Sequence, residues 1–184
     1  MRGDRLPHSP DPLLFDASPL LHSAKVDRLD VLGGLVKGHT CFTTRSVLDE
    51  IKRNDPLAYA EVGRAAWLSV VQTDSLEFLV AYGRWSSRMG LTDDHNVGET
   101  MLCAYAELHG GTLVLDDKQA RRTAGSYGLH VKGTLGLITD ACRGGHVTVV
   151  GASMLVDELH ASGMRLPFPR GGFEGWARYK GLLE

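Results

Sequence analysis

Two short apolar runs that each end in aspartate constrain the fold more than any other feature of this sequence. Leu13–Phe15 is followed by Asp16, and Thr112–Leu115 is followed by Asp116 and Asp117. Such runs are typical of strands buried on both faces of a parallel sheet. Because the carboxyl ends of parallel strands meet at one edge of a sheet, we expect these aspartates to lie close together.

Helical patterns alternate with these runs. Ser18 and Pro19 predict a helix start, with Ser18 as the N-cap and Pro19 in the first helical position. Asn96 and Glu99 have the spacing of a capping box at the start of another helix. The further expected strands are 41–43, 70–71 and 129–131, and the expected helices are a helix or helix pair over 18–36, then 46–52, 58–67, 76–89, 96–109, 118–127, 135–142 and 154–160. The predicted class is therefore α/β, with a central, mostly parallel sheet between two layers of helices.

Size and composition fit one globular domain with its own hydrophobic core. The chain has 184 residues, of which 43% are hydrophobic and 23% are charged. We expect a leader over residues 1–12, which is polar and proline-rich, a folded domain over 13–166, and a tail over 167–184.

Charge and cysteine content restrict the setting in which the chain works. Its formal net charge is −2, so any attraction for nucleic acid must come from local patches and bound cations. Cys41, Cys103 and Cys142 are odd in number and widely spaced, which favours a reducing, cytoplasmic location. No apolar run has the length of a membrane span, so no membrane partner is expected.

Each acidic residue of interest also has a simpler explanation. Asp16 can cap a helix, although Ser18 and Pro19 supply a better start there; one of Asp116 and Asp117 can cap the helix that follows. Glu99 can belong to the capping box, and Glu50 can be a solvated charge on a helix face.

Taken together, the carboxylates indicate a metal site. Clustered carboxylates repel one another, and a hard cation such as Mg²⁺ or Mn²⁺ relieves that repulsion. Sites of this kind suit phosphodiester hydrolysis.

Several motifs follow one another along the chain: Phe15–Leu21 (FDASPLL), Ser46–Ile51 (SVLDEI), Val97–Thr100 (VGET), Leu113–Arg121 (LVLDDKQAR), Gly133–Leu137 (GTLGL), Val156–Leu159 (VDEL) and Gly163–Leu166 (GMRL). In this order they resemble the motifs of PIN domains. The resemblance covers about residues 13 to 166. It departs from the family's small toxins in having Glu99 where Asp is frequent, a longer stretch between Glu50 and Glu99, and an unmatched tail.

The resemblance implies a PIN-like fold and a Mg²⁺- or Mn²⁺-dependent endonuclease that acts mostly on RNA. It assigns catalytic roles to Asp16, Glu50, Glu99 and Asp117, and metal binding to Asp16, Glu99 and Asp117, with Asp116 as a possible substitute. Many small family members are toxins of toxin–antitoxin pairs, so the resemblance also implies a small antitoxin partner and a homodimer.

Other residues suggest contacts with substrate. Lys118, Arg121 and Arg122 follow the aspartates on one helix and can meet a phosphate backbone or form a solvated face. Ser18, with Thr134, can orient carboxylates or water.

Two aromatic groups favour packing over RNA binding. Arg84, Trp85 and Arg88 can hold RNA, but packing of the ring beside the arginine stems is favoured. Phe173, Trp176 and Tyr179 recur at helical spacing in the tail, which favours docking on the core or on a second subunit over base binding.

Two alternative functions stay open. A Mg²⁺-dependent phosphoryl-transfer domain of the phosphatase type has Asp-x-Asp after the first strand, whereas this chain has Asp16-Ala17-Ser18. A catalytically silent PIN-like binding module is the second alternative.

Overall fold

The computed structural model describes residues 11–90 and 96–184. In these residues five short strands form one sheet: β1 (Leu13–Phe15), β2 (Cys41–Thr43), β3 (Leu68–Val70), β4 (Thr112–Val114) and β5 (His130–Lys132). The strand order is β3-β2-β1-β4-β5, and all four neighbouring pairs are parallel. The α/β class with a parallel sheet is therefore confirmed.

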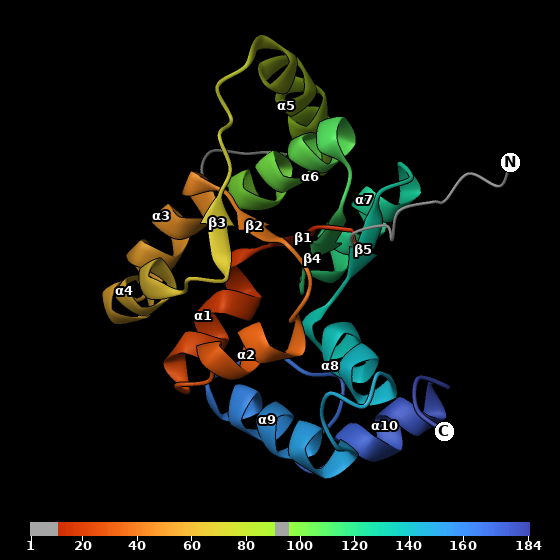
Figure 1. Ribbon diagram of the computed structural model, residues 1–184. Coiled ribbons are helices and arrows are strands. Elements are labelled where there is room, and N and C mark those ends of the chain that lie inside the picture. Colours follow the sequence, from red (N-terminus) through yellow and green to blue (C-terminus); the bar gives the residue numbers. More distant parts are fainter. Residues whose placement is uncertain (1–10, 91–95) are drawn as a thin grey trace, which may run out of the picture.

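Helices cover both faces of this sheet. Within the described residues they are α1 (Ala17–Lys25), α2 (Leu29–Leu35), α3 (Arg45–Asn54), α4 (Pro56–Arg64), α5 (Leu76–Met89), α6 (Val97–His109), α7 (Lys118–Ser126), α8 (Thr134–Arg143), α9 (Val149–Ala161) and α10 (Phe173–Tyr179). Figure 1 shows α5, α6 and α7 on one side of the sheet and α1, α2 and α8 on the other. This is the predicted three-layer α/β/α arrangement.

The two strands that the sequence marks most clearly lie side by side at the centre. Leu14 of β1 pairs with Leu113 of β4, and both side chains are fully buried. The chain passes from β1 towards β3 on one side of this pair and from β4 to β5 on the other. The junction of β1 and β4 is thus the switch point of the sheet, where ligands of open α/β folds bind.

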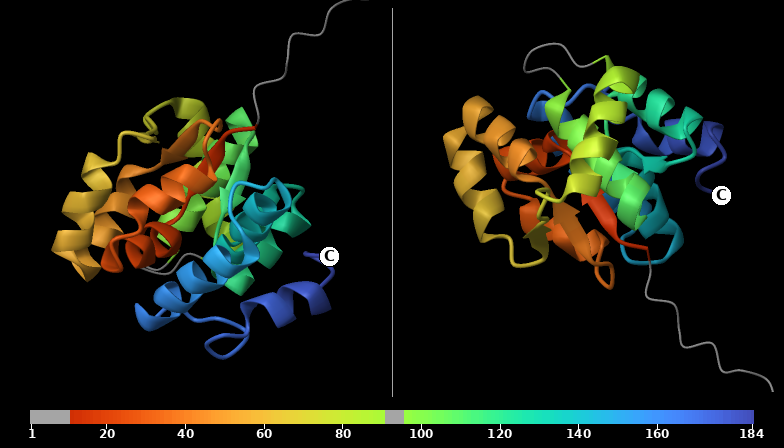
Figure 2. Two further views of the ribbon diagram at one scale, coloured as in Figure 1. Left: turned by 60° about the horizontal axis from the view of Figure 1, so that its bottom comes forward. Right: turned by 90° about the horizontal axis from the view of Figure 1, so that it is seen from above.

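The C-terminal segment docks on the domain through a second, smaller core. Phe173 and Ala177 of α10 are fully buried against residues of α8 and α9 that include Ile138, Val156 and Leu159. The views of Figure 2 show α9 and α10 together beside α8. The predicted docking of the tail therefore involves Phe173, whereas Tyr179 stays exposed.

Several predicted boundaries shift in the structure. The stretch over 18–36 forms a pair of helices, and Asp27 between them has a φ of 55°. α9 begins at Val149 and not at 154, because Thr148 accepts a hydrogen bond from the backbone N–H of Gly151 and caps it. None of the helices in the described ranges has both the length and the apolar character needed to cross a bilayer.

Candidate metal centre

Asp16 is at the switch point of the sheet and has an unusual environment. It follows β1 directly and is only 5% exposed. It occupies the N-cap position of α1, yet its side chain accepts no capping hydrogen bond. Within the described chain, Asp16 Oδ1 is buried without any hydrogen-bond partner. Capping therefore does not explain this carboxylate.

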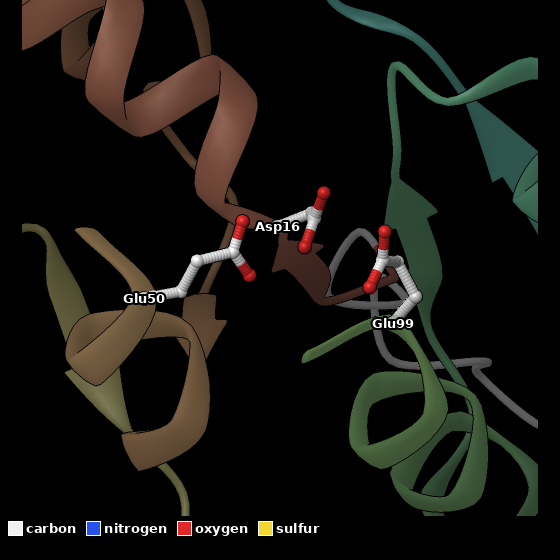
Figure 3. Close-up of side chains that lie close together, drawn as sticks. All are labelled: Asp16, Glu50 and Glu99. Carbon is white, nitrogen blue, oxygen red and sulfur yellow. The ribbon is translucent and has the colours of Figure 1, made fainter. Parts of the chain in front are cut away.

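Glu50 and Glu99 reach the same place from two different helices. Glu50 lies on α3, which is anchored by the buried side chains of Val47, Leu48 and Ile51. Glu99 lies in the first turn of α6. Oxygens of the three carboxylates lie within 4.8 Å of one another. Figure 3 shows Asp16 between the two glutamates, with all three side chains directed towards a common point.

Gly98 makes this close approach possible. A Cβ atom at this position would come within 3.0 Å of Val47 Cγ2 and 3.4 Å of both Asp16 Oδ1 and Glu50 Oε2. A glycine at position 98 therefore leaves the space between the carboxylates open, whereas a larger residue would reduce it. This role of Gly98 was not predicted from the sequence, although the Gly-Glu pair of the VGET motif is a signal for it.

The three carboxylates have little compensating positive charge. Among the described residues, no lysine, arginine or histidine forms an ion pair with them. Burial and Glu99 outweigh the positive charge of Arg53, which lowers the pKa of Glu50. Burial raises the pKa of Asp16 well above its usual value, and the negative charges of Glu99 and Glu50 raise it further. Burial also raises the pKa of Glu50, with a further contribution from Glu99.

The pKa of Glu99 shifts in the same direction. It is raised first by burial and also by the charge of Asp117, against the opposing effect of a backbone hydrogen bond. The described residues therefore do not supply the positive charge that would stabilise all three carboxylates in their ionised form.

Asp116 is beside the cluster and is held by three hydrogen bonds. Its Oδ1 accepts from the backbone N–H of Thr134 at 2.8 Å, and its Oδ2 accepts from Thr134 Oγ1 at 2.8 Å and Ser18 Oγ at 3.3 Å. Its charge contributes to the raised pKa of Asp16. Ser18 and Thr134 therefore orient a carboxylate, as the sequence suggested.

Asp117 has a different local task. It is the N-cap of α7, and its Oδ1 accepts a 2.7 Å hydrogen bond from the backbone N–H of Ala120. One aspartate of the pair thus caps the helix, as expected. The structure brings Asp16, Glu50 and Glu99 together as a triad, with Asp116 and Asp117 next to them.

Two predicted helix caps are wrong. α1 begins at Ala17, so Ser18 lies inside the helix, where its hydroxyl reaches Asp116 instead of capping. α6 begins directly after Asn96, as predicted, but the Asn96 side chain makes no capping hydrogen bond. Asn96 has a φ of 64°, and its side-chain amide donates to the carbonyl of Met89 at 3.4 Å. The capping box therefore does not form, and the Glu99 side chain is free to face the triad.

The three predicted substrate-binding cations are placed differently. Arg121 Nη1 donates to the carbonyl oxygens of Leu115 at 2.8 Å and Asp116 at 2.6 Å, so it holds the end of β4 in place. Lys118 and Arg122 are exposed and line a groove of about 650 Å³ along α7, which Asp117 also borders.

The other cationic cluster is structural, as predicted. Trp85 is buried and donates through Nε1 to Glu107 at 2.6 Å. Arg84 and Arg88 form ion pairs with the same glutamate, and the Arg88 guanidinium lies over the rings of Trp85 and Tyr127.

The triad fits a hard divalent cation. Its donors are all carboxylate oxygens, the ligands preferred by Mg²⁺ and Mn²⁺. The buried, unpartnered oxygen of Asp16 faces the other two carboxylates, and a cation there would supply the charge that the described residues do not. Asp16, Glu50 and Glu99 are the residues that could hold it.

The fold and the site together define an α/β/α domain with an acidic, metal-binding type of site at the switch point of its sheet. Comparison with known families identifies which such domain it is. A family model described as "DUF3368: PIN domain" matches residues 12–169. The chain therefore belongs to the PIN-domain family, as the sequence resemblance predicted. No curated protein and no solved structure matches the chain.

Proposed function

We propose that the protein is a divalent-metal-dependent endoribonuclease. The observation that carries this proposal is the triad itself: three carboxylates within 4.8 Å, with one buried oxygen that has no partner in the described chain. Such an arrangement is costly in a metal-free protein, because burial and mutual repulsion both oppose ionisation. Membership of the PIN-domain family, whose members are generally metal-dependent nucleases, supports the same function.

The roles of the residues follow from their positions. Asp16, Glu50 and Glu99 would hold Mg²⁺ or Mn²⁺ through carboxylate oxygens. When bound, the ion would supply activation of water and compensation of the charge on the phosphate. Asp116, fixed by Ser18 and Thr134, adds negative charge at the rim of the site. Asp117 is the fourth acidic residue to which the resemblance assigns a catalytic role. It would act there in addition to capping α7.

The substrate approaches along a basic groove. Lys118 and Arg122 line the groove next to Asp117, and both side chains are exposed. Exposed cations of this kind contact phosphates without selecting a base sequence. Because the chain as a whole carries a net charge of −2, binding depends on this local patch and on the bound cation.

The first experiment measures cleavage of a labelled single-stranded RNA in Mn²⁺, in Mg²⁺ and in EDTA. We expect cleavage by the wild type that requires the metal and is lost in Asp16→Asn. A variant with Asp49→Asn is the matched control, because Asp49 neighbours Glu50 but pairs with Arg45 on the surface. Cleavage that survives EDTA or Asp16→Asn would refute the proposal.

The same samples separate the two alternative functions. A silent binding module would show RNA binding without cleavage in any metal. A phosphoryl-transfer domain would become labelled by acetyl phosphate in an Asp16-dependent manner. In contrast, a nuclease should cleave the RNA without becoming labelled. In either metal-dependent case Mn²⁺ should raise the melting temperature and Asp16→Asn should remove the increase, since the ion binds only the folded site.

The toxin role is a finer proposal that rests on the family. It predicts growth arrest on expression in bacteria, relief of the arrest by Asp16→Asn, and a short antitoxin gene next to this one. Growth of cells that express the wild type at the same rate as cells that express Asp16→Asn would count against it. The homodimer implied by the same resemblance is tested by sedimentation.

A further inference from the structure

A second cleft lies beside the acidic edge and shares Asp117 and Lys118 with the groove along α7. It has a volume of about 500 Å³ and lies between the N-terminal ends of α7 and α8 and the C-terminal segment. The lining residues that bear on its chemistry are Asp116, Asp117, Lys118, Arg165, Trp176 and Leu182. This volume falls within the roughly 300–1,000 Å³ typical of ligand pockets.

The cleft has two chemically different parts. Asp116 and Asp117, whose charges act on Asp16 and Glu99 of the triad, line one part of it, whereas Leu135, Leu166, Trp176 and Leu182 form an aromatic and aliphatic wall. Lys118 and Arg165 are exposed at its rim. In the part of the chain that the structure describes, neither cation forms an ion pair.

Trp176 gives this wall a flat aromatic surface. It is half-buried, and its ring packs against Phe168 with the centroids 5.1 Å apart, so its position is fixed by the protein. It also lines the cleft. Because this ring is already held in position, stacking of a second flat ring on it costs little conformational entropy.

Two residues of this wall lie outside the part of the chain that the family model matches. The match ends at residue 169, whereas Trp176 and Leu182 come from the segment beyond it. The segment is held by its own core, in which Phe173 and Ala177 are fully buried. The C-terminal extension therefore adds an aromatic wall to the acidic edge.

We propose that this cleft binds one unpaired nucleotide of the RNA strand next to the scissile phosphodiester. The base stacks on Trp176 and packs against the neighbouring leucines, while Lys118 and Arg165 contact its phosphates. A base inside a duplex is stacked on both sides and cannot enter the cleft, so the substrate is single-stranded at this position. This inference rests on the proposed function and assigns a subsite to it.

The test measures binding without cleavage. Fluorescence anisotropy of an end-labelled single-stranded oligouridylate is followed in EDTA as protein is added, and again with a labelled blunt RNA duplex of the same length. We expect saturable binding of the single strand, and binding of the duplex that is at least about tenfold weaker. Equal affinity for the two RNAs, or no binding of the single strand, would overturn the proposal.

Variants assign the effect to the cleft. Trp176→Leu should weaken single-strand binding about tenfold or more, because it removes the stacking surface. Trp176→Phe should restore most of the affinity. Tyr179→Leu is the matched control, since Tyr179 is an aromatic residue on the same helix, is 85% exposed and is absent from the lining of the cleft.

Two further measurements make the result decisive. Arg165→Gln changes an exposed side chain that should not affect folding, so weaker binding by this variant supports the cleft even if Trp176→Leu is unstable. Unchanged affinity in Arg165→Gln and in a folded Trp176→Leu would reject it. If the wild type cleaves RNA but these two variants bind normally, only the subsite fails. If these two variants lose binding and no protein cleaves, only the nuclease function fails.

Discussion

Helix α6 carries two glutamates in opposite electrostatic environments. Glu107, near its C-terminal end, accepts hydrogen bonds from Arg84, Arg88 and Trp85. Burial alone would raise the pKa of Glu107, but these hydrogen bonds outweigh it and lower the pKa. Glu99, in the first turn, faces other carboxylates, and burial raises its pKa.

The two glutamates differ in whether the protein itself compensates their negative charge. The charge of Glu107 is compensated by two arginines of the same chain, so this residue ties α5 to α6. Glu99, Asp16 and Glu50 have no such partner among the described residues, so their compensation must come from outside. Perturbed carboxylates of this kind cluster at functional sites, whereas paired ones stabilise structure.

The largest expected effect is on catalysis by variants of these two glutamates. Glu99→Gln should reduce metal-dependent RNA cleavage by at least about 100-fold, since even residues that only support metal ligands cost about 10–100-fold when changed. Glu107→Gln should leave the cleavage rate within about twofold at a temperature where both variants are folded. The comparison fails if the two variants lose equal activity, as measured by initial rates with saturating Mn²⁺.

The sequence predicted the place of this site well but not its inner geometry. Leu13–Phe15 and Thr112–Leu115 identified adjacent buried strands, because strands buried on both faces require continuous apolar runs. Their terminal aspartates then had to meet at one edge. In contrast, the contact between Glu50 and Asp16 depends on how α3 packs through Val47 and Ile51, which is tertiary information that no local pattern carries.

The capping predictions failed for a related reason. Ser18 and Asn96 have the residue types and spacing of caps, but capping competes with other hydrogen bonds. The Ser18 hydroxyl instead reaches Asp116, and Asn96 adopts a left-handed conformation at which its amide donates to Met89. Local signals therefore gave the positions of α1 and α6 to within a residue or two, while the roles of these side chains were set by their distant partners.

A smaller effect is expected from filling the space next to the triad. Gly98→Ala should weaken Mn²⁺ binding about tenfold, because the new Cβ would press on Val47 and approach the oxygens of Asp16 and Glu50. Isothermal titration calorimetry measures the affinity. Gly83→Ala on α5 is the matched control, since no atom lies within 4 Å of its added Cβ and affinity should be unchanged. Equal affinities in both variants would show that the space beside Gly98 is not used by the ion.

The stability of the chain should respond in the reverse order to activity. Glu107→Ala should lower the free energy of unfolding by about 1–2 kcal/mol, because it leaves the buried Trp85 Nε1 without its acceptor and separates two arginines from their partner. Glu99→Gln in EDTA should be neutral or stabilising, since it removes a repelling charge. Urea denaturation followed by far-UV circular dichroism measures both, and a larger loss in Glu99→Gln would contradict the distinction between the two residues.

The smallest expected effect is on the pH dependence of stability, where the two glutamates should act with opposite sign. The pKa of Glu99 is raised in the folded state. Its stabilising contribution to the free energy of unfolding is therefore fully present below the pKa of the unfolded state, and it is lost as pH rises through the folded value. The folded pKa of Glu107 is lowered, so its contribution is present above the unfolded pKa and is lost as pH falls through the folded value.

Urea titrations in EDTA from acidic to neutral pH test these signs with one variant of each residue. Relative to the wild type, Glu99→Gln should gain stability as pH rises above the ordinary glutamate pKa of about 4.3, and Glu107→Gln should lose its disadvantage as pH falls below that value. Saturating Mn²⁺ should reverse the first trend, because a bound cation favours the ionised triad that EDTA leaves uncompensated. If the trend for Glu99→Gln is the same with and without Mn²⁺, the uncompensated negative charge of Glu99 does not bind a cation.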